Sequence, residues 1–137
     1  MPICILLVPE AASPEAKQAL MGRLSSHIHE AYPVTTTHIF VREGSGSDMM
    51  LAGSLVSELP AEDNQARGAR VCFLICPPGV NADVKKAMME KLTADISDCY
   101  PGSDDVFIIH REDSPANVML NGRFQSENPK FRQSAPG

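Results

Sequence analysis

The residue best suited to chemistry in this sequence is Pro2, which directly precedes an unbroken apolar run over residues 3–8. The initiator methionine is commonly removed before a small second residue, and its removal would make the proline nitrogen a free secondary amine. A terminal amino group titrates at about pH 8, and burial lowers its pKa because burial disfavours the charged form. The neutral amine is a general base or a nucleophile, and the protonated amine is a general acid. Pro2 is therefore the leading catalytic candidate, although a proline also begins ordinary strands.

Two further side chains could bind a substrate beside such an amine. His38 lies in a stretch rich in β-branched residues and could orient or protonate a substrate oxygen, although a strand histidine also serves structural or exposed roles. Arg123 carries a forked set of donors that suits a carboxylate, although an exposed surface arginine fits the sequence equally well. Both are interpreted as possible substrate-binding residues.

The cysteines and histidines lack the spacing of a metal site. The cysteines are Cys4, Cys72, Cys76 and Cys99, and they contain no C-x-x-C pair. Most of them lie in apolar stretches, which favours reduced, buried thiols over a disulfide or a metal site. His27 and His29 are two residues apart and would diverge on a helix. We therefore expect no metal and no cofactor.

The first strand and the first helix follow from the hydrophobic pattern. Residues 3–8 do not alternate, which is typical of a strand buried on both faces. Ser13 and Pro14 suit the N-cap and first position of a helix, and Pro33 suits its end. We expect an amphipathic helix between them, because apolar residues recur there every three or four positions.

A second strand and a hairpin are expected after this helix. Residues 35–41 are rich in β-branched side chains and predict a strand. The Gly-Ser-rich stretch 44–48 predicts a turn, and residues 49–55, which contain Gly53, predict a short hairpin or a bulged edge.

The whole pattern then returns after a shift of 68 positions. Ten residues are identical over the 39 aligned positions 4–42, among them Cys4 with Cys72 and Tyr32 with Tyr100. Asn81 takes the capping place of Ser13, and Val106 to Ile109 takes the place of the second strand. One inserted residue then changes the shift to 69, so that Gly53 corresponds to Gly122.

This repeat predicts the organisation of the chain. Residues 1–137 are interpreted as one domain, with repeats over 2–55 and 70–124, a linker over 56–69 and a C-terminal tail over 125–137. Two tandem β-α-β units predict an α+β fold, with α/β connectivity within each unit, built on a four-stranded mixed sheet. Right-handed crossovers would place both helices on one face of the sheet. Other copies of the chain are expected to cover its other face in a closed ring.

Composition limits the partners and the location. A net charge of −5 and a pI of about 5.3 argue against nucleic-acid binding, which needs clustered Lys and Arg. The apolar runs are far shorter than the roughly 20 residues of a membrane span, so no membrane association is expected. The first residues lack the pattern of a secretory signal, which favours a cytoplasmic location.

Taken together, these features resemble the tautomerase superfamily, in particular its long, fused members. The resemblance rests on Pro2, the helix start over 13–17, the stretch Arg-Glu-Gly-Ser-Gly at 42–46 and the stretch Asn-Gly-Arg-Phe at 121–124. Such proteins look like two joined 4-oxalocrotonate tautomerase subunits and include cis-3-chloroacrylic acid dehalogenase and malonate semialdehyde decarboxylase. The resemblance implies a tautomerase-like fold, a homotrimer, no cofactor, and an amino-terminal proline as the catalytic group.

The resemblance also implies further site residues. Asn121 and Arg123 flank Gly122 at the hairpin where the family builds a wall of its pocket, and Arg123 is the best remaining carboxylate clamp. His29 lies near, but not in register with, a helix histidine of the dehalogenases. His110 and Arg111 are instead interpreted as part of a solvated strand end.

This sequence departs from the dehalogenases at several positions. The arginine pair of their second unit aligns with Pro77 or Pro78 and with Val80, and their water-activating glutamate aligns with Leu120. Their tyrosine aligns with Ile109. Dehalogenation and hydration need an activated water and cations that clamp a carboxylate, so both reactions are disfavoured. Apolar neighbours favour the neutral amine and a neutral or hydrophobic substrate.

These considerations lead to three functional hypotheses. The first is a cofactor-free tautomerase or isomerase in which Pro2 is the general base on a small enol or carbonyl compound, with specialised metabolism as one setting. The second uses the same proline in a decarboxylase, hydratase or Michael/aldol-type lyase. The third is a trimeric binding protein that has kept the fold without the chemistry. Because Arg70 stands where Pro2 stands in the first unit, the second unit cannot use proline chemistry.

Overall fold

Four strands form one sheet in the order β2–β1–β5–β6. They are β1 (Ile3–Val8), β2 (His38–Glu43), β5 (Arg70–Cys76) and β6 (Val106–Glu112). In this computed structural model, which describes residues 1–8, 12–33, 36–59, 69–101 and 106–129, β1 runs parallel to β2 and β5 runs parallel to β6. The two central strands, β1 and β5, are antiparallel. The expected mixed, four-stranded sheet is thus confirmed.

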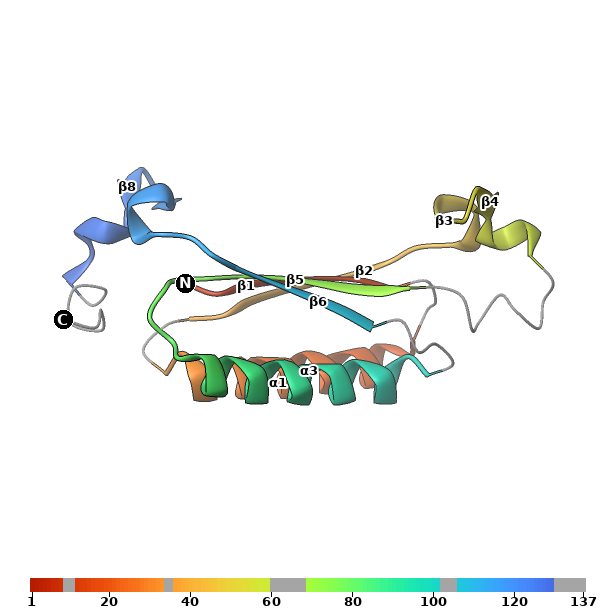
Figure 1. Ribbon diagram of the computed structural model, residues 1–137, viewed down its shortest axis with the longest axis horizontal. Helices are drawn as coiled ribbons and strands as arrows, with labels where there is room; N and C mark the ends of the chain where they lie inside the picture. Colours follow the sequence, from red (N-terminus) through yellow and green to blue (C-terminus); the bar gives the residue numbers. More distant parts are fainter. Residues whose placement is uncertain (9–11, 34–35, 60–68, 102–105, 130–137) are drawn as a thin grey trace.

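Two long helices cover one face of this sheet, as the sequence predicts (Figure 1). They are α1 (Pro14–Ala31) and α3 (Ala82–Cys99). The side chain of Ser13 accepts a hydrogen bond from the Ala16 N–H at 3.1 Å, and that of Asn81 accepts one from the Val84 N–H at 2.9 Å. Both predicted N-caps are therefore present. No helix in the described part of the chain combines the length and the apolar character needed to cross a bilayer.

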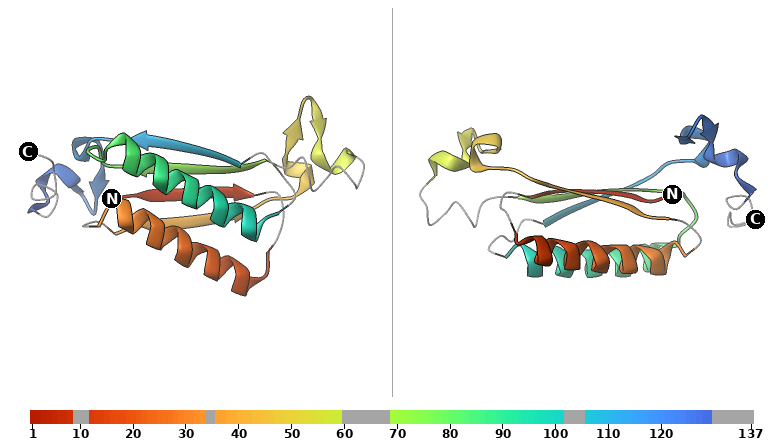
Figure 2. Two further views of the ribbon diagram at one scale, coloured as in Figure 1. Left: turned by 60° about the horizontal axis from the view of Figure 1, so that its bottom comes forward. Right: turned by 180° about the vertical axis from the view of Figure 1, so that it is seen from behind.

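The two faces of the sheet differ sharply in exposure. Side chains that point toward the helices are buried and form the core with the apolar faces of α1 and α3. The opposite face carries exposed apolar side chains, namely Leu7, Phe40, Phe73, Phe107 and Ile109. The right panel of Figure 2 views the sheet edge-on from behind and shows both helices on one side of it, with the other side uncovered along the middle of the sheet. The sequence predicts that β1 is buried on both faces. In the single chain only the helix-facing side of β1 is fully buried.

The two halves of the sheet are related by an approximate two-fold axis. In the pairing of β1 with β5, Ile5 stands opposite Phe73, its own counterpart 68 positions later. Cys4 and Cys72, also 68 positions apart, bring their Sγ atoms within 3.5 Å of each other. On the helices, His27 Nδ1 lies 2.6 Å from Asp95 Oδ2, and these residues are again 68 apart. Equivalent positions of the repeat thus meet along this axis.

The second strand of each unit differs from its predicted bounds. The strand expected over 35–41 is observed as β2 at His38–Glu43, and residues 34–35 lie outside the described residues. It begins at His38, which pairs with Ile3 at the start of β1, because the next residue of the partner, Pro2, has no N–H to continue the ladder toward Thr37. It extends to Glu43, opposite Val8. The second copy likewise continues past Ile109 to Glu112.

A small hairpin follows each half and rises above opposite ends of the sheet (Figure 1). The first consists of η1 (Gly46–Asp48), β3 (Met50–Leu51), β4 (Ser54–Leu55) and η2 (Val56–Glu58). The second consists of η3 (Pro115–Asn117), β7 (Met119–Leu120), β8 (Arg123–Phe124) and η4 (Gln125–Glu127). The amino terminus lies at the end of the sheet that carries the second hairpin (Figure 2). Most of the linker and tail predicted by the repeat, residues 60–68 and 130–137, lies outside the described residues.

Candidate active site

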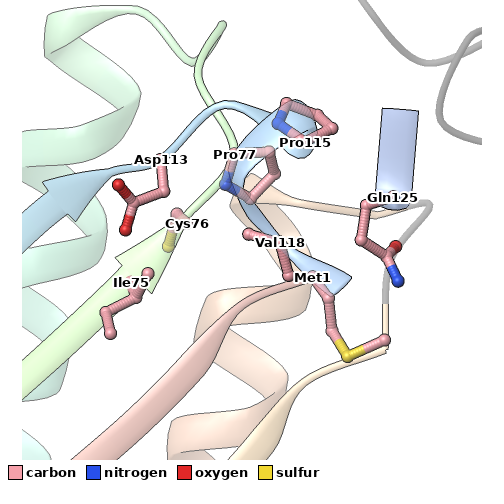
Figure 3. A pocket seen from close by; sticks show the side chains of 8 residues that line it. All are labelled: Met1, Ile75, Cys76, Pro77, Asp113, Pro115, Val118 and Gln125. Carbon is pink, nitrogen blue, oxygen red and sulfur yellow. The ribbon is translucent and has the colours of Figure 1, made fainter. Parts of the chain in front are cut away.

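The amino terminus lies in a small hollow between the end of β5 and the second hairpin (Figure 3). Its cavity volume is about 10 Å³, which is room for a single water molecule. Its lining includes Met1, Cys76, Pro77, Asp113, Val118 and Gln125. The side chain of Met1 extends across the hollow toward Gln125, and Cys76 and Asp113 lie on the opposite side (Figure 3). The terminus therefore faces a mixed polar and apolar surface.

Backbone hydrogen bonds fix the elements around this hollow. The Pro2 carbonyl accepts from the His38 N–H at 3.0 Å, which holds the terminus to β2. Ile3 of β1 pairs with Ile75 of β5, and continuing this antiparallel register by one residue places the buried Pro2 opposite Cys76. The Cys76 carbonyl accepts from the Asp113 N–H at 2.9 Å, which joins the end of β5 to the chain after β6. The terminus is thus anchored on both sides.

Burial weakens the proton affinity of the terminal amine. The amine of Met1 has a pKa lowered from 8.0 to about 6, chiefly because burial penalises its charged form, while the nearby Cys76 acts in the opposite direction. At neutral pH this amine is therefore mostly unprotonated. An unprotonated amine in a partly enclosed hollow can act as a base or as a nucleophile.

A hydrogen-bonded group of side chains lies on the helix-facing side of the same strand end. The Tyr32 hydroxyl lies 2.9 Å from His110 Nε2, and it is also hydrogen-bonded to the thiol of Cys76. Burial raises the pKa of Cys76 to about 11 and raises that of Tyr32, so both remain protonated at neutral pH. The pKa of His110 is lowered, first by burial and then by the charge of Lys85. His110, interpreted as part of a solvated strand end, is thus partly buried against Tyr32, whereas Arg111 is exposed as expected.

The predicted site residues lie in different places. His38, at the start of β2, is exposed and belongs to the alternating set of β2 residues that faces away from the helices. Asn121 and Arg123 line a second hollow of about 400 Å³ on the hairpin, which shares only Gln125 with the hollow of the terminus. His29 is exposed in the last turn of α1. The described structure thus places Met1 and the hairpin residues in adjoining hollows, with Pro2 buried behind Met1, and keeps His29 apart.

Asn121 also has a role in the backbone of the hairpin. Its φ is 53° and that of Gly122 is 79°, so both residues adopt the left-handed conformation of a tight turn. Ala52 and Gly53 adopt the same conformation in the first hairpin, with φ of 51° and 86°. Asparagine tolerates this conformation better than most residues.

Gln125 is a residue of the hollow that the sequence analysis missed, because it assigned residue 125 to a tail. Gln125 is 4% exposed, and its N–H donates to the Val118 carbonyl at 2.8 Å. Its counterpart at the shift of 69 is Val56, which is 3% exposed and donates to Met49 in the same way. Continuing the repeat by one residue would have aligned this buried glutamine with a valine.

Comparison with known proteins supports the fold. No family model matches the chain, and no curated protein matches it. Among solved structures, a symmetric trimer of a wild-type fused 4-OT superposes with a TM-score of 0.74 at 17% identity, covering 93% of this chain and 98% of that chain. Pt0534, inactivated by 2-oxo-3-pentynoate, has a TM-score of 0.74 at 15% identity, with coverage of 92% and 98%. The macrophage migration inhibitory factor of Toxoplasma gondii has a TM-score of 0.67 at 14% identity, with coverage of 88% and 97%. The resemblance to fused tautomerases is confirmed for the fold.

Proposed function

We propose that this protein is a cofactor-free tautomerase or isomerase of the tautomerase superfamily, in which Pro2 becomes the amino terminus and acts as a general base. Its substrate is a small enol or carbonyl compound. The observation that carries the proposal is the burial of the chain terminus, because the amine of Met1 lies at a hollow and burial lowers its pKa to about 6, and the nitrogen of Pro2 is the next one along the chain. The fold shared with fused 4-OT adds support.

Removal of Met1 supports this role in two ways. The cleavage frees the secondary amine of Pro2, one residue along the chain from the amine of Met1. It also removes the Met1 side chain, which lies across the hollow (Figure 3). A substrate could then lie between the amine and the amide of Gln125, whose N–H₂ group is a suitable donor to a carbonyl oxygen.

The reaction that follows is a proton transfer between carbon and the amine. The neutral amine takes a proton from the carbon next to a carbonyl, or from an enol oxygen, and returns it at the other position. A donor on the carbonyl oxygen stabilises the enolate that develops. His38, His29, Asn121 and Arg123 remain proposed substrate-binding residues, and in the single chain none of them lines the hollow of the terminus.

We also propose that the active form is a homotrimer. The open face of the sheet exposes Leu7, Phe40, Phe73, Phe107 and Ile109 to solvent in the single chain. Contiguous apolar surface of this kind is typical of a protein interface. The fused 4-OT structures are trimers by their own description. In such an assembly a neighbouring copy could bring His38 or Arg123 to the hollow.

A direct test begins with the intact mass, which shows whether Met1 is removed. Turnover of phenylenolpyruvate is then measured for the wild type, Pro2→Ala and the control Pro14→Ala, which changes the first residue of α1 instead. Pro2→Ala should lower kcat/KM by about 10²-fold or more, as expected for a general base, and Pro14→Ala should leave it unchanged. Retention of Met1, or equal turnover by Pro2→Ala, would contradict the proposal.

A lyase that works through an iminium is the alternative that the neutral amine also permits. Borohydride added with a carbonyl compound traps an iminium as a mass adduct on Pro2, whereas a proton shuttle leaves no adduct. Labelling by 2-oxo-3-pentynoate, the compound that inactivates Pt0534, provides a second probe of the amine. A chain that shows neither turnover nor labelling would be a binding protein with this fold.

A further inference from the structure

The end of the sheet near Pro2 is more polar than the equivalent end near Arg70. Because the two halves correspond by a shift of 68 or 69, each residue near Pro2 has a counterpart near Arg70. Beside Arg70, the counterpart positions hold three valines, namely Val8, Val41 and Val56. Beside Pro2, the same three positions hold Cys76, His110 and Gln125. Polar side chains thus replace valines at the end that carries the proline.

Two of these replacements contact the same tyrosine. Tyr32 lies 2.9 Å from His110 Nε2 and is hydrogen-bonded to Cys76, whose thiol is 1% exposed. Its counterpart Tyr100 is equally buried, but its hydroxyl donates to Glu43 at 3.0 Å. The tyrosine is thus common to both ends, and the cysteine–tyrosine–histidine contact is found beside Pro2 in the described part of the chain.

The contact continues to the terminal amine. Pro2 stands opposite Cys76, so their side chains lie next to each other on the helix-facing side of the sheet. Cys76 lines the hollow together with Met1, and the Cys76 thiol acts to raise the pKa of the Met1 amine. We propose that Cys76, Tyr32 and His110 form a hydrogen-bonded chain that positions the amino-terminal amine and sets its proton affinity. This inference rests on the proposed role of that amine.

The charge of His110 determines which group donates each hydrogen bond between His110, Tyr32 and Cys76. When His110 is neutral, the Tyr32 hydroxyl donates to Nε2, the Cys76 thiol donates to the hydroxyl oxygen, and the sulfur presents its lone pairs to the amine. This arrangement favours the protonated amine. When His110 is protonated, Nε2 donates to Tyr32, Tyr32 donates to Cys76, and the thiol proton turns toward the amine. This arrangement favours the neutral amine.

Charged groups around His110 determine which state prevails. Lys85 of α3 disfavours the protonated imidazole and Glu112 of β6 favours it, but burial and Lys85 outweigh Glu112 and lower the pKa of His110. Tyr32 from α1 and Cys76 from β5 are themselves neutral at working pH. The neutral histidine therefore prevails at neutral pH, and the chain supports the protonated amine that forms after the amine accepts a proton from a substrate.

The test measures the amine without measuring turnover. The rate of carbamylation of the terminal amine by cyanate is followed against pH by mass spectrometry for the wild type, Tyr32→Phe, Cys76→Val and His110→Val. These variants remove the support for the protonated amine, so the pH midpoint of labelling should fall by about half a unit or more. Cys76→Ser keeps a donor and an acceptor and should stay within about 0.2 units of the wild type.

Tyr100→Phe is the matched control, because it removes an equally buried hydroxyl at the other end of the sheet. It should leave the midpoint unchanged. Thermal melting confirms that each variant is folded, and if Tyr32→Phe does not fold, the Cys76→Val and Cys76→Ser pair decides. The inference is overturned if the labelling midpoints of Tyr32→Phe, Cys76→Val and His110→Val equal or exceed that of the wild type. It is also overturned if the midpoint of Tyr100→Phe falls as much as theirs. Shifted midpoints in a chain without turnover would support the inference and contradict the proposed tautomerase.

Discussion

The thiol of Cys4 lies 3.5 Å from the thiol of Cys72, the residue that occupies the same place in the other half of the chain. Both side chains are fully buried between the sheet and the helices. The contact lies close to the approximate two-fold axis, where each half packs against its own equivalent. It joins the two halves in one core, and it places two reactive groups beyond the reach of solvent.

This burial predicts the reactivity of the cysteines. The pKa of Cys72 is raised, first by its hydrogen bond with Cys4 and then by burial, and burial raises the pKa of Cys76 to about 11. Thiolates are the reactive form, so Ellman's reagent at pH 8 should modify at most the partly exposed Cys99 in the folded protein. All four cysteines should react in guanidinium chloride. Fast modification of two or more thiols in the native state would contradict this arrangement.

Glu43 should make stability depend on pH. Its carboxylate accepts from Lys17 Nζ at 2.7 Å, from the Ala12 N–H at 2.6 Å and from Tyr100 at 3.0 Å. The pKa of Glu43 is lowered, chiefly by the hydrogen bond from Lys17. A lowered folded-state pKa gives stability that is present above the unfolded value of 4.5 and is lost as the pH falls through the folded value.

Glu43→Gln should therefore lower the free energy of unfolding by about 1–3 kcal/mol at pH 7 and have little effect at pH 3. Urea unfolding at one protein concentration measures both values. The control is Glu58→Gln, an exposed residue of η2. An equal effect of Glu43→Gln at both pH values would show that the carboxylate charge is not the cause.

The two hairpin turns predict opposite effects of the same exchange. Ala52 holds a φ of 51°, and the left-handed conformation costs a residue with a Cβ atom about 1 kcal/mol or more. Asn121 holds a φ of 53° with less strain. Ala52→Asn should raise the free energy of unfolding by about 0.5–1 kcal/mol, and Asn121→Ala should lower it by about the same amount. The melting temperature should change in the same direction in each case. Calorimetry measures both, and a destabilised Ala52→Asn would contradict the strain argument.

The open face predicts the effect of a charge on assembly. Phe73 lies in β5 at the middle of the sheet and is 38% exposed in the single chain. Phe73→Glu should convert a trimer of about 44 kDa, three times 14.8 kDa, into a monomer, because an interface cannot bury an unpaired carboxylate cheaply. Val84→Glu is the control, since Val84 is 40% exposed on α3, away from this face. Sedimentation velocity distinguishes the species, and a trimer of Phe73→Glu would place the interface elsewhere.

Much of the fold could be predicted from local patterns. The caps at Ser13 and Asn81, the apolar run of β1 and the return of the pattern after 68 residues all involve short-range features. The bounds of β2 could not be predicted in this way. Whether Thr36 and Thr37 join the sheet depends on where the partner strand begins, and that is a property of the pairing.

The candidate site shows the same limit. Pro2 is recognisable from the sequence, because its chemistry follows from its position. His110 is not, since its neighbours Ile108 and Ile109 are both apolar and do not reveal which side of β6 faces the helices. The proximity of Cys76 to Pro2 depends on the antiparallel register of β1 and β5, which joins residues more than 70 positions apart.

Arg70 occupies the place of Pro2 at the other end of the sheet, where its side chain is fully buried and Nη2 donates to the Pro101 carbonyl at 2.8 Å. The nitrogen of Arg70 is bound to Ala69 in a peptide bond, so no residue at this position could supply a free backbone amine. Joining two units in one chain therefore fixes the number of terminal amines at one per chain, however many copies assemble. Under the proposed function, the Arg70 end therefore carries no catalytic constraint, and its residues can serve packing while the proposed chemistry is confined to the Pro2 end.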